Sequence, residues 1–450
     1  MDKNRFSLRQ TALPLTKTIL NNSVTRNIAS LYVIQIANYI LPVITVPYLV
    51  RVLGPADYGV VAFGQGLIAY FNLFVEYGFG LSATRKISFQ RNDSTALSRT
   101  VSNVWAAKIL LCVVGFGVLL PLVTVVPKLQ ESALLLLILY GMVIGNVFFP
   151  LWLFQGMEKM AAISVINLVM RLLVVIGIFT VVHRPEDYMA YAGLTSLGAI
   201  GAGLAGAGVA FRMFQIRPVI PSQRGVREAL AEGWMLFLSQ ASVSLYSVGN
   251  AFILGILTNH TAVGYYSAAE KVVKAVLSLF NPLSQAVYPR FSKMASDSRA
   301  LAMQWARRML VVMSGLGLAL SVALFAGAPV IVQILLGPQY EPSIIVMRIL
   351  SGLTLLIGAS NVLGIQLMLP FGRDRAFTSI LVGAGIINIA LAVSLAPIWQ
   401  ESGMAASVLV SEGFVTVTML IYLSLHQLNP FTRPAAEDNL VAISPWRPEG

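Results

Sequence analysis

Runs of about twenty apolar residues alternate with short polar segments along almost the whole chain, and that is the length an α-helix needs to cross the hydrocarbon core of a membrane. The pattern predicts an all-α polytopic membrane protein, and no polar run is long enough to form a large soluble domain. The twelve predicted spans are 27–50, 58–82, 101–125, 132–155, 161–182, 188–210, 234–257, 263–288, 309–330, 344–368, 376–397 and 403–426.

The chain contains an internal repeat. A shift of 205 residues carries Gln35 onto Gln240, Gly59 onto Gly264 and Arg85 onto Arg290. Six spans per half is an even number, so both halves insert with the same orientation, which predicts two six-helix bundles related by a pseudo-two-fold axis along the membrane normal around a central cavity. The predicted parts are a cytoplasmic tail (1–26), the first bundle (27–211), a cytoplasmic linker (212–232), the second bundle (233–427) and a disordered cytoplasmic tail (428–450).

The charge is distributed as expected for a membrane protein rather than a nucleic-acid-binding one. Apolar residues make up 57% of the chain, charged residues 11%, and the net charge is +12. With both termini placed in the cytoplasm, 23 Lys and Arg fall in inside segments, whereas only Arg51, Lys128 and Arg184 fall in outside loops. This asymmetry is the positive-inside rule. It supports the twelve spans with both termini inside, and it predicts no nucleic-acid partner.

Polar residues follow one face of the eighth predicted span. Ser267, Glu270, Lys274, Ser278, Asn281 and Gln285 recur at intervals of three and four residues. The 205-residue shift places Gln65 under Glu270 and Glu76 under Asn281, so both halves carry this polar face. A polar stripe of this length is costly against lipid, so it indicates a wet interior.

Charges inside the predicted spans favour an anionic cargo, because five cations outnumber three acids. Ammonium and guanidinium groups bind phosphate through charge-assisted hydrogen bonds. The candidate cargo-binding cations are Lys274, Arg171, Lys108, Arg348 and Lys271. The candidate sites for cation coupling are Glu412, Glu270 and Glu76.

Each candidate has a structural alternative. Lys108 and Arg348 lie close enough to a span end for their stems to reach the membrane surface, and Arg171 fits a structural ion pair. Glu270 stands one turn before Lys274 and would neutralise it as an i,i+4 pair. Glu412 fits a neutral, hydrogen-bonded carboxyl.

No enzyme, metal or cofactor site is predicted. The chain lacks the Gly-x-x-x-x-Gly-Lys-Ser/Thr loop that holds nucleotide phosphates. The single cysteine, Cys112, lies in an apolar span, and the three histidines, His183, His260 and His426, are scattered.

Six motifs together resemble the polysaccharide flippases of the multidrug/oligosaccharidyl-lipid/polysaccharide exporter superfamily, over about residues 27–427. They are LGPADYG (53–59), EYGFG (76–80) with Arg85, WLFQGMEK (152–159), LGPQY (336–340), GIQLMLP (364–370), and GMAAS (403–407) followed by Glu412. The resemblance implies a multi-pass protein of the bacterial inner membrane that transfers polyprenyl-pyrophosphate-linked oligosaccharide repeat units from the cytoplasmic to the periplasmic leaflet.

Within that reading, Lys274 and Arg171 are the first candidates for holding the pyrophosphate. Six amide side chains are candidates for meeting sugar hydroxyls: Gln35, Asn38, Gln65, Gln240, Asn250 and Asn281. Membrane lipid, a polysaccharide polymerase and a chain-length regulator are the candidate partners. Two alternatives stay open: a multidrug/cation antiporter of the same superfamily, and a non-transporting scaffold of a polysaccharide assembly complex.

Overall fold

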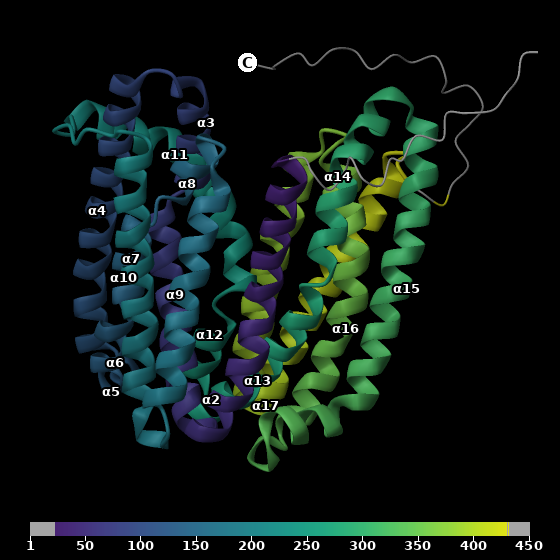
Figure 1. Cartoon of the computed structure of the whole chain (residues 1–450). Coiled ribbons are helices and arrows are strands. Elements are labelled where there is room, and N and C mark those ends of the chain that lie inside the picture. Colours follow the sequence, from purple (N-terminus) through teal and green to yellow (C-terminus); the bar gives the residue numbers. More distant parts are fainter. Residues whose placement is uncertain (1–22, 430, 432–450) are drawn as a thin grey trace, which may run out of the picture.

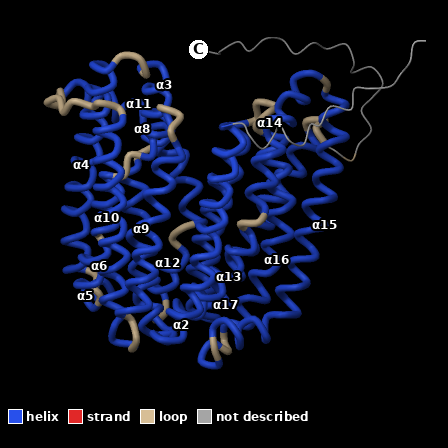
Figure 2. Tube along the Cα trace, viewed as in Figure 1, coloured by secondary structure: helices blue, strands red, loops and turns tan. Residues whose placement is uncertain are grey.

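The computed structural model describes the backbone of residues 23–429 and Phe431, and all its regular elements are helices (Figure 1, Figure 2). This confirms the predicted all-α class. Most of the two predicted tails lies outside the described residues. The side chains of residues 23–40 also lie outside them, and with them the candidates Gln35 and Asn38.

The first half contains α2 (Ser23–Glu76), α3 (Phe79–Gln90), α4 (Ser94–Val125), α5 (Pro127–Glu131), α6 (Ala133–Leu139), α7 (Gly141–Phe148), α8 (Leu151–Gly156), α9 (Met160–Val181), η2 (Pro185–Asp187) and α10 (Tyr188–Met213). The second half contains α11 (Gln223–Ser247), α12 (Asn250–Leu257), α13 (His260–Leu277), α14 (Phe280–Asp297), α15 (Arg299–Ile331), η3 (Val332–Leu336), η4 (Pro338–Tyr340), α16 (Ser343–Asn361), η5 (Val362–Met368) and α17 (Asp374–Leu425).

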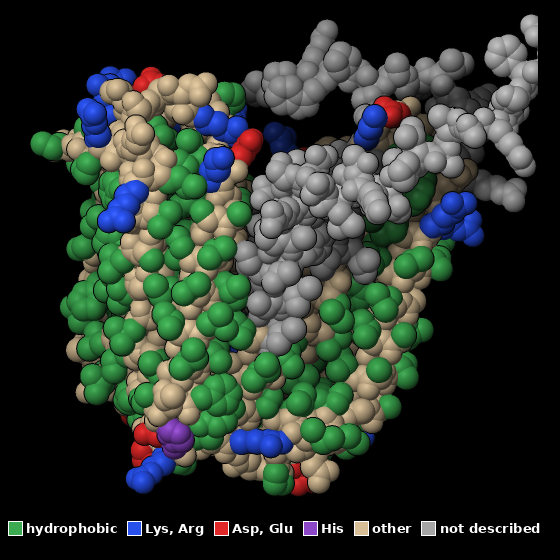
Figure 3. Space-filling view, viewed as in Figure 1, with side chains coloured by type: hydrophobic (Ala, Val, Ile, Leu, Met, Phe, Trp, Pro, Cys, Tyr) green, Lys and Arg blue, Asp and Glu red, His purple; other side chains and the backbone are tan. Residues whose placement is uncertain are grey.

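Eight helical segments of the described chain are long and apolar enough to cross a membrane. Two of them contain a sharp break: α2 at Gly54, with φ 72°, and α17 at Gln400, with φ 48°. A left-handed residue reverses the helix direction, and glycine adopts this conformation without strain. Figure 3 shows apolar side chains over the middle of the visible face and charged ones near its two ends, as expected for a membrane-embedded surface. The total of twelve spans stays a prediction.

The repeat found in the sequence is visible in the helix starts. Asp93 caps the N-terminus of α4 by accepting hydrogen bonds from the backbone N–H groups of Thr95 and Ala96. The residue 205 positions later, Ser298, caps α15 by accepting from the N–H of Leu301. A side-chain acceptor at this position satisfies N–H groups that the helix itself cannot pair. Both halves therefore begin the helix of their third predicted span in the same register.

The two halves meet where α2 continues after its break at Gly54 and where α13 begins, and the two helices pack closely there. Gly59 and its repeat counterpart Gly264 lie in this contact, where an added Cβ on Gly59 would collide with the carbonyl oxygen of His260 and one on Gly264 with that of Pro55. Small residues allow membrane helices this close approach. We call this end of the molecule, which holds Gly54, the junction end; Figure 1 shows the halves meeting there and diverging toward the other end.

Polar side chains also join the halves at the junction end. The Lys128 ammonium donates to the carbonyl oxygens of Gly255 and Ile256, at 3.0 and 2.7 Å, and so caps the C-terminal end of α12. Gln339 donates to the carbonyl of Arg51 at 3.1 Å, and Arg51 donates to the carbonyl of Ile334. A cation at a helix C-terminus also interacts favourably with the helix dipole. Two of the three cations that the sequence places outside therefore bind one half to the other.

The predicted linker is largely helical. The chain leaves α10 at Met213 and enters α11 at Gln223, where Ser222 caps the helix by accepting from the N–H of Gly225. The second part of the linker, from Gln223, is thus the beginning of α11. It packs against the first half, where Lys86 on α3 pairs with Glu232 at 2.9 Å. The boundary between the bundles, placed near residue 233, stays a prediction.

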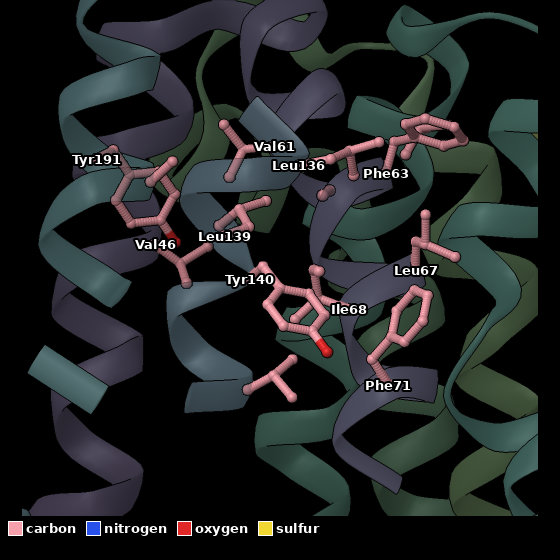
Figure 4. Packing of buried hydrophobic residues seen from close by; sticks show 14 of the residues in the cluster. Val46, Val61, Phe63, Leu67, Ile68, Phe71, Leu136, Leu139, Tyr140 and Tyr191 are labelled. Carbon is pink, nitrogen blue, oxygen red and sulfur yellow. The ribbon is translucent and has the colours of Figure 1, made fainter. Parts of the chain in front are cut away.

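The interior of the first half is a tightly packed apolar cluster. Val61 on α2 lies near Leu136 and Leu139 on α6, and Tyr191 enters from α10 (Figure 4). Phe71 on α2 packs against Tyr140 at the end of α6, with 5.7 Å between ring centres. This packing holds α2, which carries Glu76, against α6 and α10.

Candidate functional site

Lys108 lies inside the first half and has no exposed surface. Its ammonium is 2.9 Å from a carboxylate oxygen of Glu76, 3.0 Å from the backbone carbonyl of Asn146 and 3.2 Å from the side-chain oxygen of Asn146. The amide of Asn146 donates in turn to Asn72 at 3.1 Å. All three ammonium donors are used, so the prediction that Lys108 reaches the membrane surface is wrong. The network favours a structural role for this lysine.

Lys274 lies on α13 with 53% of its side chain exposed. It pairs with Glu270 one turn earlier at 3.0 Å, which confirms the predicted i,i+4 pair. Glu270 is only 18% exposed and also accepts a hydrogen bond from the Tyr266 hydroxyl at 3.0 Å. The carboxylate is therefore held on both sides, while the ammonium, with three donors, keeps hydrogen-bonding capacity for an anion.

Lys271 points toward the first half. Its ammonium lies 4.9 Å from the centre of the Tyr58 ring, a cation–π contact between α13 and α2. Tyr58 is buried at the junction end. This position favours a role of Lys271 in joining the halves.

The remaining two cations differ in their surroundings. Arg171 on α9 is exposed, and no ion pair or hydrogen bond of its guanidinium is found among the described residues. Arg348 on α16 lies over the ring of Phe325, with 5.4 Å between the guanidinium carbon and the ring centre. Arg171 is thus open to an anion, whereas Arg348 is partly occupied by an aromatic face.

The structure separates the amide candidates. Gln65 is half-buried and donates to the Tyr191 hydroxyl at 3.5 Å, and Gln240 is half-buried on α11. Asn250 is buried, with 2% of its surface exposed, at the start of α12. Asn281 on α14 is exposed. Asn281 is therefore the described amide candidate most accessible to a ligand.

Glu412 lies in the second half of α17 and is 8% exposed. One of its carboxylate oxygens accepts a hydrogen bond from Ser360 on α16 at 2.8 Å. No cation pairs with it among the described residues. Burial of an unpaired charge is costly, which is consistent with the predicted alternative of a neutral, hydrogen-bonded carboxyl.

A recess beside α14 was not predicted from the sequence. It is lined by Asn281, Ser284, Tyr288, Asn361, Ile365 and Leu369, from α14, α16, η5 and the turn after η5, and its volume is about 370 Å³. The hydroxyl of Ser284 donates to the side-chain oxygen of Asn361 at 2.8 Å. These residues lie 77 positions apart, so no local pattern brings them together. In the described chain, no group of three His, Cys, Asp or Glu side chains is placed to hold a metal ion.

Comparison with known proteins decides the family. Residues 24–295 match the family described as polysaccharide biosynthesis protein. A "putative O-antigen transporter" of Escherichia coli strain K12 is 34% identical over 406 residues, which cover 90% of this chain and 98% of that protein. The chain belongs to the polysaccharide biosynthesis protein family. A second protein with the same description, from Shigella dysenteriae, is 27% identical over 88% of this chain and 98% of its own length.

Solved structures show the fold that this family member shares. The lipid II flippase MurJ, in an inward closed conformation, matches with a TM-score of 0.72 and 11% identity over 87% of each chain. An inward-facing multidrug transporter of the MATE family matches with a TM-score of 0.61 and 13% identity, over 86% of this chain and 94% of its own. At these identities the likeness concerns the fold alone. Together with the family match, it supports the resemblance to polysaccharide flippases of the exporter superfamily and a multi-pass membrane protein that is not an enzyme.

Proposed function

We propose that this protein is a flippase that moves polyprenyl-pyrophosphate-linked oligosaccharide repeat units from the cytoplasmic to the periplasmic leaflet of the bacterial inner membrane. The observation that carries the proposal is the 34% identity to a putative O-antigen transporter over 98% of that protein's length. The flipped unit would pass to a polysaccharide polymerase and its chain-length regulator, with both termini of the flippase in the cytoplasm.

The charged side chains support an anionic cargo. Arg171 and Lys274 are the cations that combine an exposed side chain with a position within a predicted span. A pyrophosphate offers several anionic oxygens, and Arg binds such groups bidentately while Lys acts as a point charge. We assign these two residues to the pyrophosphate.

The junction supports alternating access. The halves are tied at one end through Gly59 and Gly264 and through the bonds of Lys128 and Gln339, and they diverge at the other end (Figure 1). By the predicted topology, the junction end faces the periplasm. Release of these contacts, with closure at the opposite end, would move the cargo across the membrane.

A multidrug antiporter is the second candidate, because a MATE transporter shares the fold. A cationic drug requires an available acid, yet Glu76 is paired with Lys108 and Glu270 with Lys274. Glu412 accepts from Ser360 and is almost fully buried. The described interior therefore fits a cation poorly.

The test is transport by the purified protein in liposomes. A fluorescent polyprenyl-pyrophosphate oligosaccharide and a cationic dye are compared for wild type, Lys274→Ala and Arg171→Ala. Lys159, which is exposed outside the predicted spans, provides the control Lys159→Ala. We expect the glycolipid to move, with about a tenfold loss or more in each of the first two variants, as for a lost charge-assisted hydrogen bond. Movement of the dye alone would establish the antiporter instead.

Cation coupling through Glu412 is a separate part of the proposal. Glu412→Gln keeps the size and the acceptor for Ser360 but removes the titratable proton. We expect glycolipid transport by this variant to lose its response to an imposed pH gradient. A response equal to that of the wild type would remove Glu412 from the mechanism.

A further inference from the structure

The recess beside α14 has a mostly apolar lining with a few uncharged polar groups. Asn281 and Asn361 supply amides, Ser284 a hydroxyl, Tyr288 a phenol, and Ile365 and Leu369 apolar wall. Among the side chains that the structure describes, no Lys, Arg, Asp or Glu lines it. Small-molecule sites combine apolar and aromatic surface with a few fixed polar groups, in volumes of roughly 300–1,000 Å³. The chemistry suits a neutral ligand rich in hydroxyl groups and poorly suits an ion.

The polar groups of the recess are held in place. The side-chain oxygen of Asn361 accepts a hydrogen bond from the Ser284 hydroxyl. The two N–H donors of the same amide take no part in this bond. Behind it, Gln366, 1% exposed, donates to the backbone carbonyl of Ser284 at 3.1 Å. This bond ties η5 to α14. The recess is therefore preorganised across two helices that are distant in the sequence.

The backbone at the recess departs from the regular α-helix. Residues 362–368 form a π-helical segment, η5, that directly continues α16. Such widened turns are rare and occur frequently at functional sites, because they move side chains off the regular helical positions. Here the widened turn places Ile365 at the recess while Gln366 reaches α14.

The recess also lies along the chain from Lys274, the residue that we propose binds the pyrophosphate. Asn281 follows Lys274 by seven residues, two helical turns, and the chain between them stays in right-handed helical conformation at Ser278 and Leu279. Seven residues of helix span about 10 Å, so a cargo whose pyrophosphate lies at Lys274 would reach Asn281 with sugars beyond the first.

We propose that the recess formed by Asn281, Ser284, Tyr288 and Asn361 is a carbohydrate subsite that binds the uncharged sugars of the cargo. The inference rests on the proposed flippase function and deepens it: the cations bind the pyrophosphate and the recess binds the sugars. Tyr288, 37% exposed, offers its ring to the apolar face of a sugar, and the amides offer donors and acceptors to its hydroxyls.

The experiment measures binding of two lipid-free probes to the full-length protein in lipid nanodiscs. The first probe is the repeat-unit oligosaccharide released by mild acid from the cell's own lipid carriers and then dephosphorylated. The second is inorganic pyrophosphate. The variants are Asn281→Ala, whose exposed side chain can be removed without disturbing packing, and Ile365→Trp, which fills the recess from its exposed edge and keeps its hydrogen bonds. Asn92→Ala, at an exposed turn, is the control.

We expect the oligosaccharide to bind about five- to tenfold more weakly to Asn281→Ala and at least tenfold more weakly to Ile365→Trp, as for one or two lost hydrogen bonds. Pyrophosphate binding should stay within twofold. Tyr288→Phe should bind the sugar nearly as the wild type does, and Tyr288→Ala should not. Wild-type affinity for the oligosaccharide in both recess variants would overturn the subsite, as would no binding by the wild type.

Glycolipid transport by the wild type separates the two proposals. If the wild type flips the glycolipid and the recess variants bind the free glycan with wild-type affinity, the subsite is refuted and the proposed flippase function stands. A wild type that flips no glycolipid refutes the proposed function, and the binding of the free oligosaccharide then still decides the recess.

Discussion

The two halves place polar residues at matching repeat positions but use them differently. Glu76 in the first half is paired with the buried Lys108, whereas its counterpart 205 residues later, Asn281, is exposed and lines the recess. The same shift carries Lys108 onto Met313, which is 3% exposed in an apolar cluster. The second half thus lacks both members of the ion pair. One half uses its inward polar positions for its own stability, and the other leaves them open to a ligand.

The junction shows the opposite relation between the halves. Gly59 and Gly264 occupy equivalent positions, and each faces the backbone of the other half. Close approach is needed equally from both sides, so both positions kept glycine. Symmetry is retained where the halves touch and lost where each faces its own interior.

The largest effect is expected from removing one member of the buried pair. Lys108→Met, which introduces the residue of the second half, leaves the Glu76 carboxylate and Asn146 without their cation. We expect a loss of about 3 kcal/mol in unfolding free energy, at the low end for broken buried pairs because Glu76 is 30% exposed. Thermal or denaturant unfolding of the purified protein in detergent measures it.

The combined variant Lys108→Met with Glu76→Asn tests whether the unpaired charge of Glu76 causes this loss of stability. It reproduces the second half's pair of residues and removes both charges, so at least half of the lost stability should return. If the double variant is no more stable than Lys108→Met, the charge of Glu76 is not the source of the loss.

The next effect concerns the symmetric junction. Gly59→Ala and Gly264→Ala each place a methyl group against a backbone carbonyl of the other half. We expect similar losses of about 1–3 kcal/mol in unfolding free energy, as for other overpacked contacts. The controls Gly117→Ala on α4 and Gly315→Ala on α15 meet nothing within 4 Å and should be neutral or slightly stabilising. A large loss in one junction variant alone would mean that the contact is not symmetric.

The sequence predicted the features that repeat or follow a local period. The 205-residue shift correctly placed Gly59 with Gly264 and extends to the caps Asp93 and Ser298. The i,i+4 pair of Glu270 and Lys274 follows from helix geometry alone. The ion pair could be predicted because it needs only the spacing along one helix, and the repeat because it needs only a comparison of the sequence with itself.

Contacts between helices were beyond the sequence. Lys108 was recognised as an intramembrane cation, but its partner Glu76 lies 32 residues away on another helix, so its burial was missed. The recess was missed for the same reason, and because the π-helical segment at 362–368 shifts the positions that a regular helical period would assign. Packing between distant segments, rather than periodicity, determines both.

A smaller effect should appear as pH dependence at the junction. His260 begins α13 and packs against the ring of Phe63, with 5.2 Å between ring centres. Burial lowers the pKa of His260. The charge of Glu131 opposes this shift and the charge of Lys128 adds to it. The unfolded state then binds the proton at higher pH than the folded state does. Stability is therefore lost as pH falls through the unfolded value of about 6.5 toward the lower folded value.

The repeat counterpart of His260 is Pro55, which does not titrate, so this sensitivity belongs to one side of a symmetric contact. We expect the melting temperature of the wild type to fall more between pH 8 and pH 5 than that of His260→Gln. Parallel melting curves for the two proteins over this range would assign the pH dependence to other groups.

The smallest effect is expected at the ion pair of the second half, and it sharpens the comparison with Lys108. Glu270→Gln removes the partner of Lys274, but the ammonium is 53% exposed and remains solvated, so the unfolding free energy should change by only about 0.3–0.5 kcal/mol. The same substitution frees the ammonium for an anion, so binding of inorganic pyrophosphate should tighten, and the gain should disappear in Glu270→Gln combined with Lys274→Ala. A loss as large as that of Lys108→Met would show that both halves use their charges for stability, and the contrast between them would fail.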